Sequence, residues 1–115
     1  MVERAYVPER GHLVWLNFTP HAGHEQAGRR PALVLTPAAY NAPTGLMIGV
    51  PVTSRVKNYP FEVALPGDCA VQGVVLCDQA RSLDWRSRGA DYAGTASTET
   101  LEQVSRKLGT LLQIT

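Results

Sequence analysis

The chain has 115 residues, a net charge of +1 at neutral pH and two cysteines. A chain of this length forms one domain with a hydrophobic core of useful size, so residues 1–115 are treated as a single domain. The near-zero charge excludes a uniformly basic nucleic-acid coat but leaves local basic patches open. No apolar run reaches the length of a membrane span, and no membrane contact is expected.

The N-terminus lacks the apolar segment of a secretory signal peptide, which predicts a cytoplasmic protein. Cys69 and Cys77 match no metal-binding spacing, and in that compartment they are expected to be reduced. We therefore expect no metal and no other cofactor. A zinc site that combines the cysteines with His21 and His24 is the less favoured alternative.

The first half of the chain is predicted to consist of short strands separated by turns. His12–Phe18 and Ala32–Thr36 are rich in strand-forming residues and are bounded by glycine or proline. Pro37–Asn41 resembles one helical turn, and Leu46–Thr53 is a third strand. Alternation along that strand puts its aliphatic residues on one face and Thr53 on the other.

Glycine and proline on the second face of this strand, at positions 49 and 51, suggest a bulge or a sheet edge.

The second half continues the β pattern and ends in a helix. Further strands are predicted within Pro60–Leu65 and Gln72–Asp78 and near Ser82–Trp85. Ser97 is a plausible N-cap for a C-terminal helix whose apolar stripe should pack on the core, formed by Leu101, Val104, Leu108 and Leu111. The pattern predicts a mainly β fold with a C-terminal α-helix, arranged as a small sandwich or barrel.

The segment Pro20–Pro37 has the character of a polar loop that leads directly into a buried strand. Pro31 restricts Arg30 to an extended conformation at the junction, and glycines at 23 and 28 permit sharp turns. Loops anchored by a rigid strand commonly display binding and catalytic groups. The alternative is an ordinary surface loop with solvated charges.

Seven of the eleven positively charged residues fall into three groups along the chain. If the fold brings the groups together, they form a basic groove suited to a phosphate backbone. If it does not, they are ordinary solvated charges that point in different directions. The groups are Arg29 and Arg30; Arg55 and Lys57; and Arg81, Arg86 and Arg88.

Four stretches resemble the MazF/PemK (Kid) toxins of bacterial toxin–antitoxin pairs. They are Gly11-His-Leu-Val-Trp-Leu, Gly23-His-Glu-Gln-Ala-Gly-Arg-Arg-Pro-Ala-Leu-Val-Leu, Val50-Pro-Val-Thr-Ser and Val75-Leu-Cys-Asp-Gln. The combination of Glu-Gln-x-Gly-x-Arg-Pro with a later Pro-Val-Thr is specific, whereas either motif alone is weak. The resemblance covers nearly the whole chain.

The resemblance implies an SH3-like small β-barrel that forms a homodimer. It also implies a sequence-specific, metal-independent endoribonuclease that cleaves single-stranded mRNA and leaves a 2′,3′-cyclic phosphate and a 5′-hydroxyl. A cognate MazE/PemI-like antitoxin would inhibit the enzyme by placing its acidic C-terminal segment in the RNA groove.

Carried over by motif, the principal catalytic pair corresponds to Arg30 and Thr53. In the Kid-like branch, the equivalents of His24 and Asp78 also matter. Kid-like members carry an arginine two positions before that aspartate, where this chain has Leu76. The MazF-type pair is intact, so we give it the greater weight.

The residue chemistry fits cleavage of RNA by its own 2′-hydroxyl. The guanidinium of Arg30 can grip two phosphate oxygens, and Thr53 can hydrogen-bond the phosphate or the 2′-hydroxyl. The general base is left open between Glu25 and His24. Further RNA contacts are predicted for Asn17, Gln26, Gly28, Ser54, Asp78 and Gln79.

Three alternatives concern individual roles and the function as a whole. Asp78 can instead form a structural ion pair with Arg81 or Arg30. Trp15 and Trp85 are expected to be core or dimer contacts rather than platforms for bases. A non-catalytic toxin of the CcdB type, which poisons gyrase by protein contact, resembles this fold but would not need Arg30 and Thr53.

Overall fold

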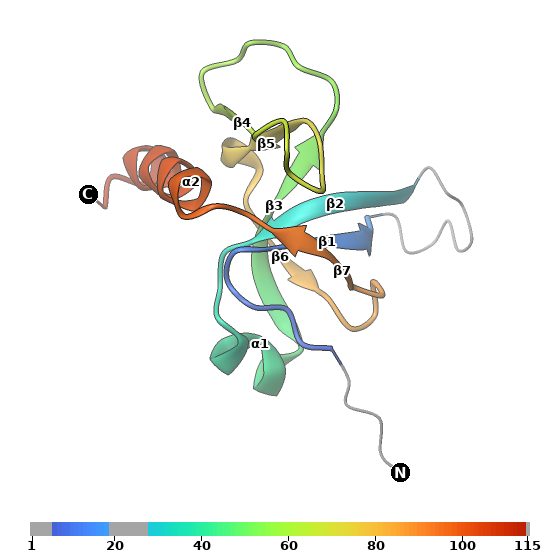
Figure 1. Ribbon diagram of the computed structural model, residues 1–115. Helices are drawn as coiled ribbons and strands as arrows, with labels where there is room; N and C mark the ends of the chain where they lie inside the picture. Colours follow the sequence, from blue (N-terminus) through green and yellow to red (C-terminus); the bar gives the residue numbers. More distant parts are fainter. Residues whose placement is uncertain (1–5, 19–27, 115) are drawn as a thin grey trace.

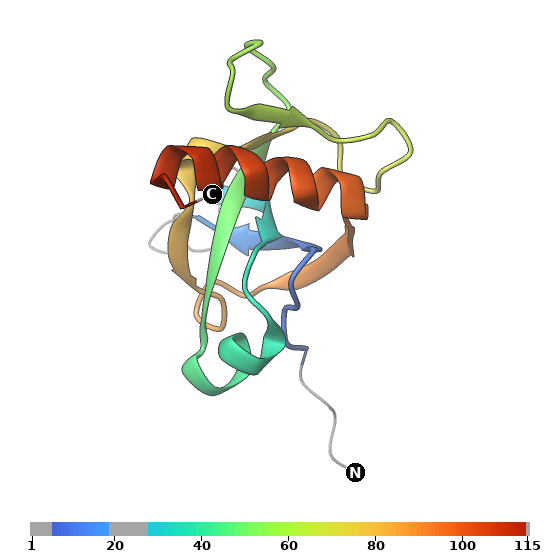
Figure 2. The same ribbon diagram turned by 90° about the vertical axis from the view of Figure 1, so that its left-hand side faces the viewer.

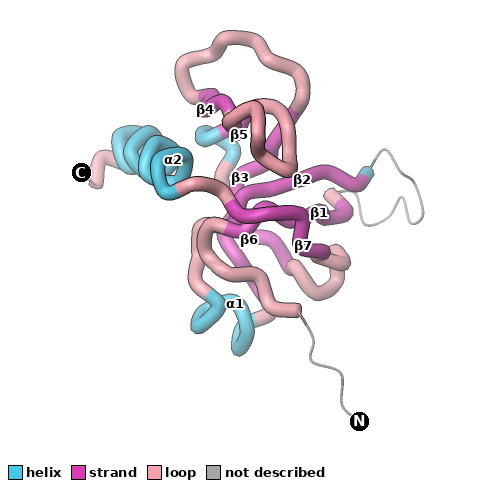
Figure 3. The backbone as a smooth tube through the Cα atoms, viewed as in Figure 1, coloured by secondary structure: helices cyan, strands magenta, loops and turns pink. Residues whose placement is uncertain are grey.

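The computed structural model describes residues 6–18 and 28–114. The strands are β1 (His12–Asn17), β2 (Arg29–Val34), β3 (Leu46–Thr53), β4 (Glu62–Ala64), β5 (Val74–Leu76), β6 (Arg81–Asp84) and β7 (Asp91–Thr95). The helices are α1 (Ala38–Thr44), α2 (Thr98–Leu112) and a short 3₁₀ turn, η3 (Cys77–Gln79) (Figure 1). The strands form the centre of the molecule, and α2 lies beside β4 and β5 (Figure 3).

The sheet follows the order β4-β5-β3-β2-β1-β7, with β6 paired to β3 outside this path. Every described pairing is antiparallel, as the absence of a βαβ pattern predicts, and the sheet does not close on itself. The mainly β fold with a C-terminal helix is therefore confirmed. The predicted strand at 32–36 begins earlier, at Arg29, so Arg30 lies within β2 rather than at its junction with a loop.

β3 lies at the centre of the sheet, and the predicted edge at Gly49 and Pro51 is therefore wrong. One side of β3 pairs with β2, while the other side pairs with β6 at its start and with β5 at its end. Pro51 has no backbone N–H to donate, so it is well suited to the position where the strand exchanges one partner for another. The two unusual residues thus mark a change of partner.

The core has two parts, one on each face of the central strands. Leu13, Leu33, Val50 and Val52 belong to the part beneath α2, and the opposite part includes Val14, Leu16, Ala32, Met47, Leu83 and Trp85. The aliphatic face predicted for β3 is buried only in its second half, because Leu46 and Ile48 remain 36% and 39% exposed. That exposed end is available for another contact.

The helix α2 begins where the sequence predicts. The Ser97 hydroxyl accepts a hydrogen bond from the Thr100 backbone N–H at 3.1 Å, and Val104 is fully buried. Figure 2 shows α2 crossing in front of β3. The apolar stripe predicted for α2 is not buried along its whole length, because Leu111 near the end of the helix is 41% exposed. No helix in the described ranges is long and apolar enough to cross a membrane.

Candidate active site

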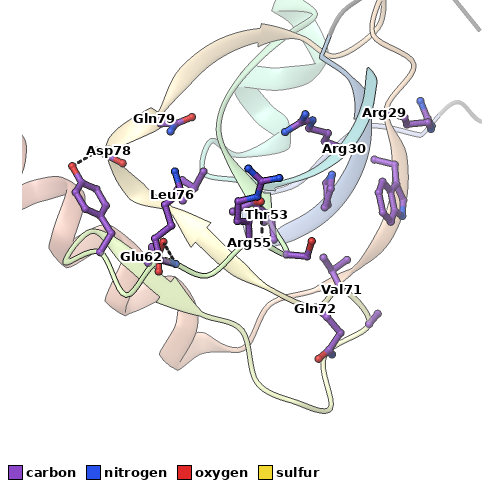
Figure 4. Close-up of a pocket in the computed structure, with 17 residues that line it drawn as sticks. Arg29, Arg30, Thr53, Arg55, Glu62, Val71, Gln72, Leu76, Asp78 and Gln79 are labelled. Atoms are coloured by element: carbon purple, nitrogen blue, oxygen red, sulfur yellow. Dashed lines mark hydrogen bonds between the residues drawn. The ribbon is translucent and has the colours of Figure 1, made fainter. Parts of the chain in front are cut away.

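A groove of about 950 Å³ lies at the ends of β2 and β3. Its walls come from β1 to β5, from the loops that follow β3 and β4, and from η3. Most of the side chains that line the groove are charged or polar (Figure 4). Trp15, Pro31, Val52 and Val71 contribute apolar surface. The groove therefore combines groups that suit a phosphate with groups that suit a base.

The β2–β3 register brings Arg30 and Thr53 together. The paired residues end at Ala32 and Pro51, and continuing the same register by two residues sets Arg30 opposite Thr53. Both side chains lie in the middle of the groove (Figure 4). Because the ladder ends before this pair, the two strands can diverge and leave space between the guanidinium and the hydroxyl. The two residues carried over as a catalytic pair are therefore neighbours in the fold.

Local contacts fix the position of Thr53. Its Oγ1 accepts a hydrogen bond from the Arg55 backbone N–H at 3.1 Å, which occupies an oxygen lone pair rather than the hydroxyl proton. On the side away from β2, Thr53 pairs with Val74 of β5. The hydroxyl can thus donate to a ligand while its oxygen is held by the loop that follows β3.

Gly73 also supports Thr53, and the sequence analysis did not identify it. Gly73 has a φ of +125°, and a Cβ at this position would lie 2.2 Å from the Thr53 backbone oxygen. Only glycine allows β5 to approach the end of β3 this closely. An isolated glycine inside the predicted strand Gln72–Asp78 was the available indication.

The prediction of one basic groove from three charge groups is correct for the first two and wrong for the third. Arg29, Arg30, Arg55 and Lys57 line the groove. The third group lies elsewhere because β6 pairs with the opposite end of β3, over Leu46–Gly49. There, Arg81 lies over the Phe18 ring at 5.7 Å, Arg86 lies over the Trp85 ring at 4.8 Å, and Arg88 donates to the carbonyls of Asn17 and Phe18 at 3.0 Å.

Arg29 and Arg30 leave β2 in different directions, as consecutive strand residues do (Figure 4). The Arg29 guanidinium forms an ion pair with Asp91 and donates to Asn17 Oδ1 at 3.3 Å and to the Gly89 carbonyl at 3.0 Å. This is the only ion pair within residues 6–18 and 28–114. Asn17 is thus engaged beside β7, and it is not among the described side chains that line the groove.

Asp78 lies in the groove, but its partner differs from those considered in the sequence analysis. The Tyr59 hydroxyl donates a hydrogen bond to Asp78 Oδ2 at 3.0 Å (Figure 4). This bond, together with the carboxylate charge, raises the pKa of Tyr59. Glu62 Oε2 similarly accepts from the Lys57 backbone N–H at 3.1 Å. The loop between β3 and β4 is therefore tied at two points to the polar end of the groove.

Two other predicted RNA contacts, Ser54 and Gln79, also line the groove. Gly28 is buried at the start of β2, where its carbonyl accepts from the Phe18 backbone N–H at 2.7 Å. The remaining predicted residues of the first loop, His24, Glu25 and Gln26, lie outside the described residues.

The two tryptophans occupy different environments. Trp85 is 5% exposed, and its indole N–H donates to the Asn41 carbonyl at 3.0 Å, so its predicted place in the core is confirmed. Trp15 is 40% exposed and lines the groove, so a core role is wrong for this residue. Cys69 and Cys77 are both free, and burial raises the pKa of the Cys77 thiol to about 11.

The fold and the groove define the class: a small antiparallel β protein with a guanidinium and a hydroxyl in one groove that further basic side chains line. The family model for the PemK-like, MazF-like toxin of type II toxin–antitoxin systems matches residues 9–112. The chain belongs to this family of toxins.

Similar proteins extend over almost the whole chain. The chain is 48% identical to the endoribonuclease toxin MazF of Escherichia coli K12 over 112 residues, which is 97% of this chain and 99% of that protein. The crystal structure of MazE-MazF from Deinococcus radiodurans has a TM-score of 0.87 and 58% identity, covering 96% of this chain and 100% of that one. MazF from the same organism has a TM-score of 0.86 and 65% identity, covering 95% and 99%.

These findings confirm the prediction of an endoribonuclease toxin of the MazF type. They do not favour the CcdB-like alternative, in which the protein would act without nuclease chemistry.

Proposed function

We propose that the groove binds single-stranded mRNA and directs the 2′-hydroxyl of one nucleotide at the adjacent phosphate. The products are a 2′,3′-cyclic phosphate and a 5′-hydroxyl end. The observation that carries this proposal is the placement of Arg30 opposite Thr53 in a groove that Arg55 and Lys57 also line. Because the nucleophile belongs to the substrate, the same site would not cleave DNA.

Arg30 supplies charge stabilisation in this proposal. A guanidinium binds two phosphate oxygens through parallel hydrogen bonds and stays charged at physiological pH. Its exposed position in the groove leaves it accessible to the phosphate, whose negative charge grows as the pentacoordinate transition state forms. Loss of one such donor typically lowers the rate by about 10²–10³-fold.

Thr53 orients the reacting groups. With its oxygen held by the Arg55 backbone N–H, the hydroxyl can donate to a phosphate oxygen and hold the in-line geometry. Proton removal from the 2′-hydroxyl is assigned to His24 or Glu25, the two candidates of the first loop. No metal or cofactor is required by this chemistry.

The test is cleavage of a fluorescent single-stranded RNA in EDTA. Arg30→Ala should lower kcat by about 10²–10³-fold. The thermal unfolding temperature of the protein should not change, because the Arg30 side chain is exposed. Arg106→Ala removes an exposed arginine of α2 and serves as the matched control, with unchanged activity. Retained activity in Arg30→Ala, or cleavage of a substrate with a 2′-deoxy scissile nucleotide, would contradict the proposal.

The groove is also the proposed site of inhibition by a cognate MazE/PemI-like antitoxin. The solved structure of MazE-MazF from Deinococcus radiodurans supports a complex of this kind. Arg30, Arg55 and Lys57 would attract an acidic, extended segment as they attract a phosphate backbone. Antitoxin and RNA would then exclude each other, and the toxin would act in the cytoplasm when the antitoxin is removed.

A homodimer is proposed through an apolar surface that shares only Asp78 with the lining of the active groove. Ile48, Leu111, Leu112 and Ile114 are 39%, 41%, 58% and 73% exposed, and all four line a second depression of about 740 Å³ between α2 and the β3–β6 region. Exposed apolar surface of this kind marks an interaction site. A second copy of the chain would bury the part of the α2 stripe that the core leaves uncovered.

A further inference from the structure

Trp15 is an aromatic residue for which the proposed chemistry has no use. Its neighbours on β1, Val14 and Leu16, are fully buried, whereas the indole is 40% exposed on the wall of the groove. Strand alternation explains why Trp15 faces away from the core part that contains its neighbours. It does not explain why a large apolar ring occupies an open position beside a cationic site.

The neighbours of Trp15 form an apolar shelf. Trp15 lies opposite Pro31 on β2 and opposite Asp91 on β7, and directly opposed residues share a face of the sheet. Pro31 lines the groove beside Trp15, so the ring of one and the indole of the other are adjacent. The Asp91 carboxylate is occupied by Arg29, so the shelf does not present an unneutralised negative charge to a phosphate.

The shelf lies close to the proposed reaction centre. Arg30 is paired with Leu16, so Trp15 is one strand across and one residue along from Arg30; the two side chains leave the sheet on opposite faces, and both line the groove. With strands about 4.8 Å apart and a rise of about 3.3 Å per residue, the two backbones are about 6 Å apart. Stacked nucleotides advance by about 3.4 Å, so a base on Trp15 belongs to a nucleotide within about two steps of the phosphate held by Arg30.

We propose that Trp15 is a stacking platform for one unpaired nucleobase of the RNA, next to the scissile phosphate. The proposal rests on the function proposed above and adds a base subsite to it. An indole face accepts any base, while nearby Arg30 and Arg55 track the backbone, which is how proteins hold single strands. Trp15 therefore contributes affinity and alignment, and sequence discrimination comes from polar groups elsewhere in the groove.

The expected effect is large enough to measure. Base–aromatic stacking typically changes affinity by roughly 5- to 150-fold when the aromatic residue becomes alanine. Trp15→Ala should raise KM by a factor in this range and leave kcat nearly unchanged, because the indole does not touch the reacting atoms. Trp15→Phe keeps a stacking face and should stay within about threefold of the native protein.

Tryptophan fluorescence gives a direct readout, because Trp15 and Trp85 are the only two tryptophans. The probe is a single-stranded RNA with a 2′-deoxy nucleotide at the mapped cleavage position, which binds without being cut. It should quench the emission of the native protein and leave Trp15→Phe, with only the buried Trp85, unchanged. Tyr40→Ala removes a 38% exposed aromatic ring outside the groove lining and is the matched control.

A scan with single abasic nucleotides identifies the stacked base. At one position, the abasic penalty and the Trp15→Ala penalty should overlap, so that the combination costs little more than either change alone. Full additivity at every position, or native RNA affinity in Trp15→Ala, would overturn the proposal. The proposal would also be overturned if Trp15→Ala lost affinity only for an acidic antitoxin peptide and not for RNA. The shelf would then bind a protein side chain.

Failure of the proposed function has a different signature. If the site is not a nuclease, the native protein itself produces no cleavage fragments, whatever residue stands at position 15. The stacking proposal fails when the native protein cleaves RNA and Trp15→Ala binds it equally well.

Discussion

Gly73→Ala tests how strictly the fold controls Thr53. A Cβ at Gly73 would lie 2.2 Å from the Thr53 backbone oxygen and 2.8 Å from its carbonyl carbon. Real carbon contacts of this kind are not shorter than about 3.0 Å, so β5 and the end of β3 must separate by nearly one ångström. A displacement of about 1 Å at a reacting group can cost about 10²-fold in rate. The positive φ adds strain of about 1–3 kcal/mol to the folded state.

We therefore expect Gly73→Ala to lower kcat by about 10²-fold and to reduce thermal stability, with RNA affinity within a few-fold of native because Arg30 lies on another strand. Single-turnover cleavage of saturating RNA measures the rate, normalised to the fraction folded by circular dichroism. Gly67→Ala is the matched control, since a Cβ there meets nothing within 4 Å and no positive φ is involved. Native kcat in folded Gly73→Ala would refute the reasoning that links Gly73 to catalysis through Thr53.

Three further predictions concern the surroundings of the groove. Asp91→Asn removes the counter-charge of Arg29, so RNA should bind about two- to fivefold more tightly at low salt, measured by fluorescence anisotropy; unchanged affinity at all salt concentrations would contradict this expectation. Asp78→Asn removes the carboxylate charge that favours the neutral phenol and strengthens the bond to it, so the pKa of Tyr59 should fall toward its ordinary value near 10. In the native protein, the bond to Asp78 should therefore favour the folded state below a pH of about 10 and be lost as the pH rises through the elevated pKa. An ultraviolet phenolate titration, with Tyr59→Phe as reference, measures the pKa of Tyr59. Equal pKa values in the native protein and in Asp78→Asn would show that the bond is absent. Leu112→Glu places a charge on the apolar surface of α2 and should shift the protein to monomer in sedimentation equilibrium, whereas a native distribution would exclude this surface as the dimer contact.

Local pattern was sufficient to predict the strands with clear hydrophobic character. β1 and β3 agree with their predicted ranges to within one residue, and Ser97 caps α2 as predicted. β7 was missed because Asp91–Thr95 is short, partly polar and contains a glycine. Its pairing with β1 provides the stabilisation that local propensity lacks. Non-local pairing of this kind leaves no periodic pattern in the sequence.

The site was predicted unevenly for the same reason. The motifs led to the prediction that Arg30 and Thr53 act together, but only the β2–β3 register explains why residues this far apart in the chain lie close to each other. Charge grouping suggested a single groove, yet Arg81, Arg86 and Arg88 follow β6 to the other end of β3. Trp15 was assigned to the core or a dimer contact on composition alone. Its exposure depends on how far β7 and the β4–β5 loop cover the sheet, which is a tertiary property.

The change of partner along β3 explains why the groove lies where it does. Pairing with β2 ends at Pro51, and the next residues, Val52 and Thr53, pair with β5 instead. From that point, β3 follows β5, while β2 follows β1 through Arg30 and Arg29. The strands that carry the guanidinium and the hydroxyl are therefore not hydrogen-bonded to each other at the site. In the proposed reaction, a phosphate enters between them without breaking a ladder, and Arg30 and Thr53 each keep a rigid support on the far side.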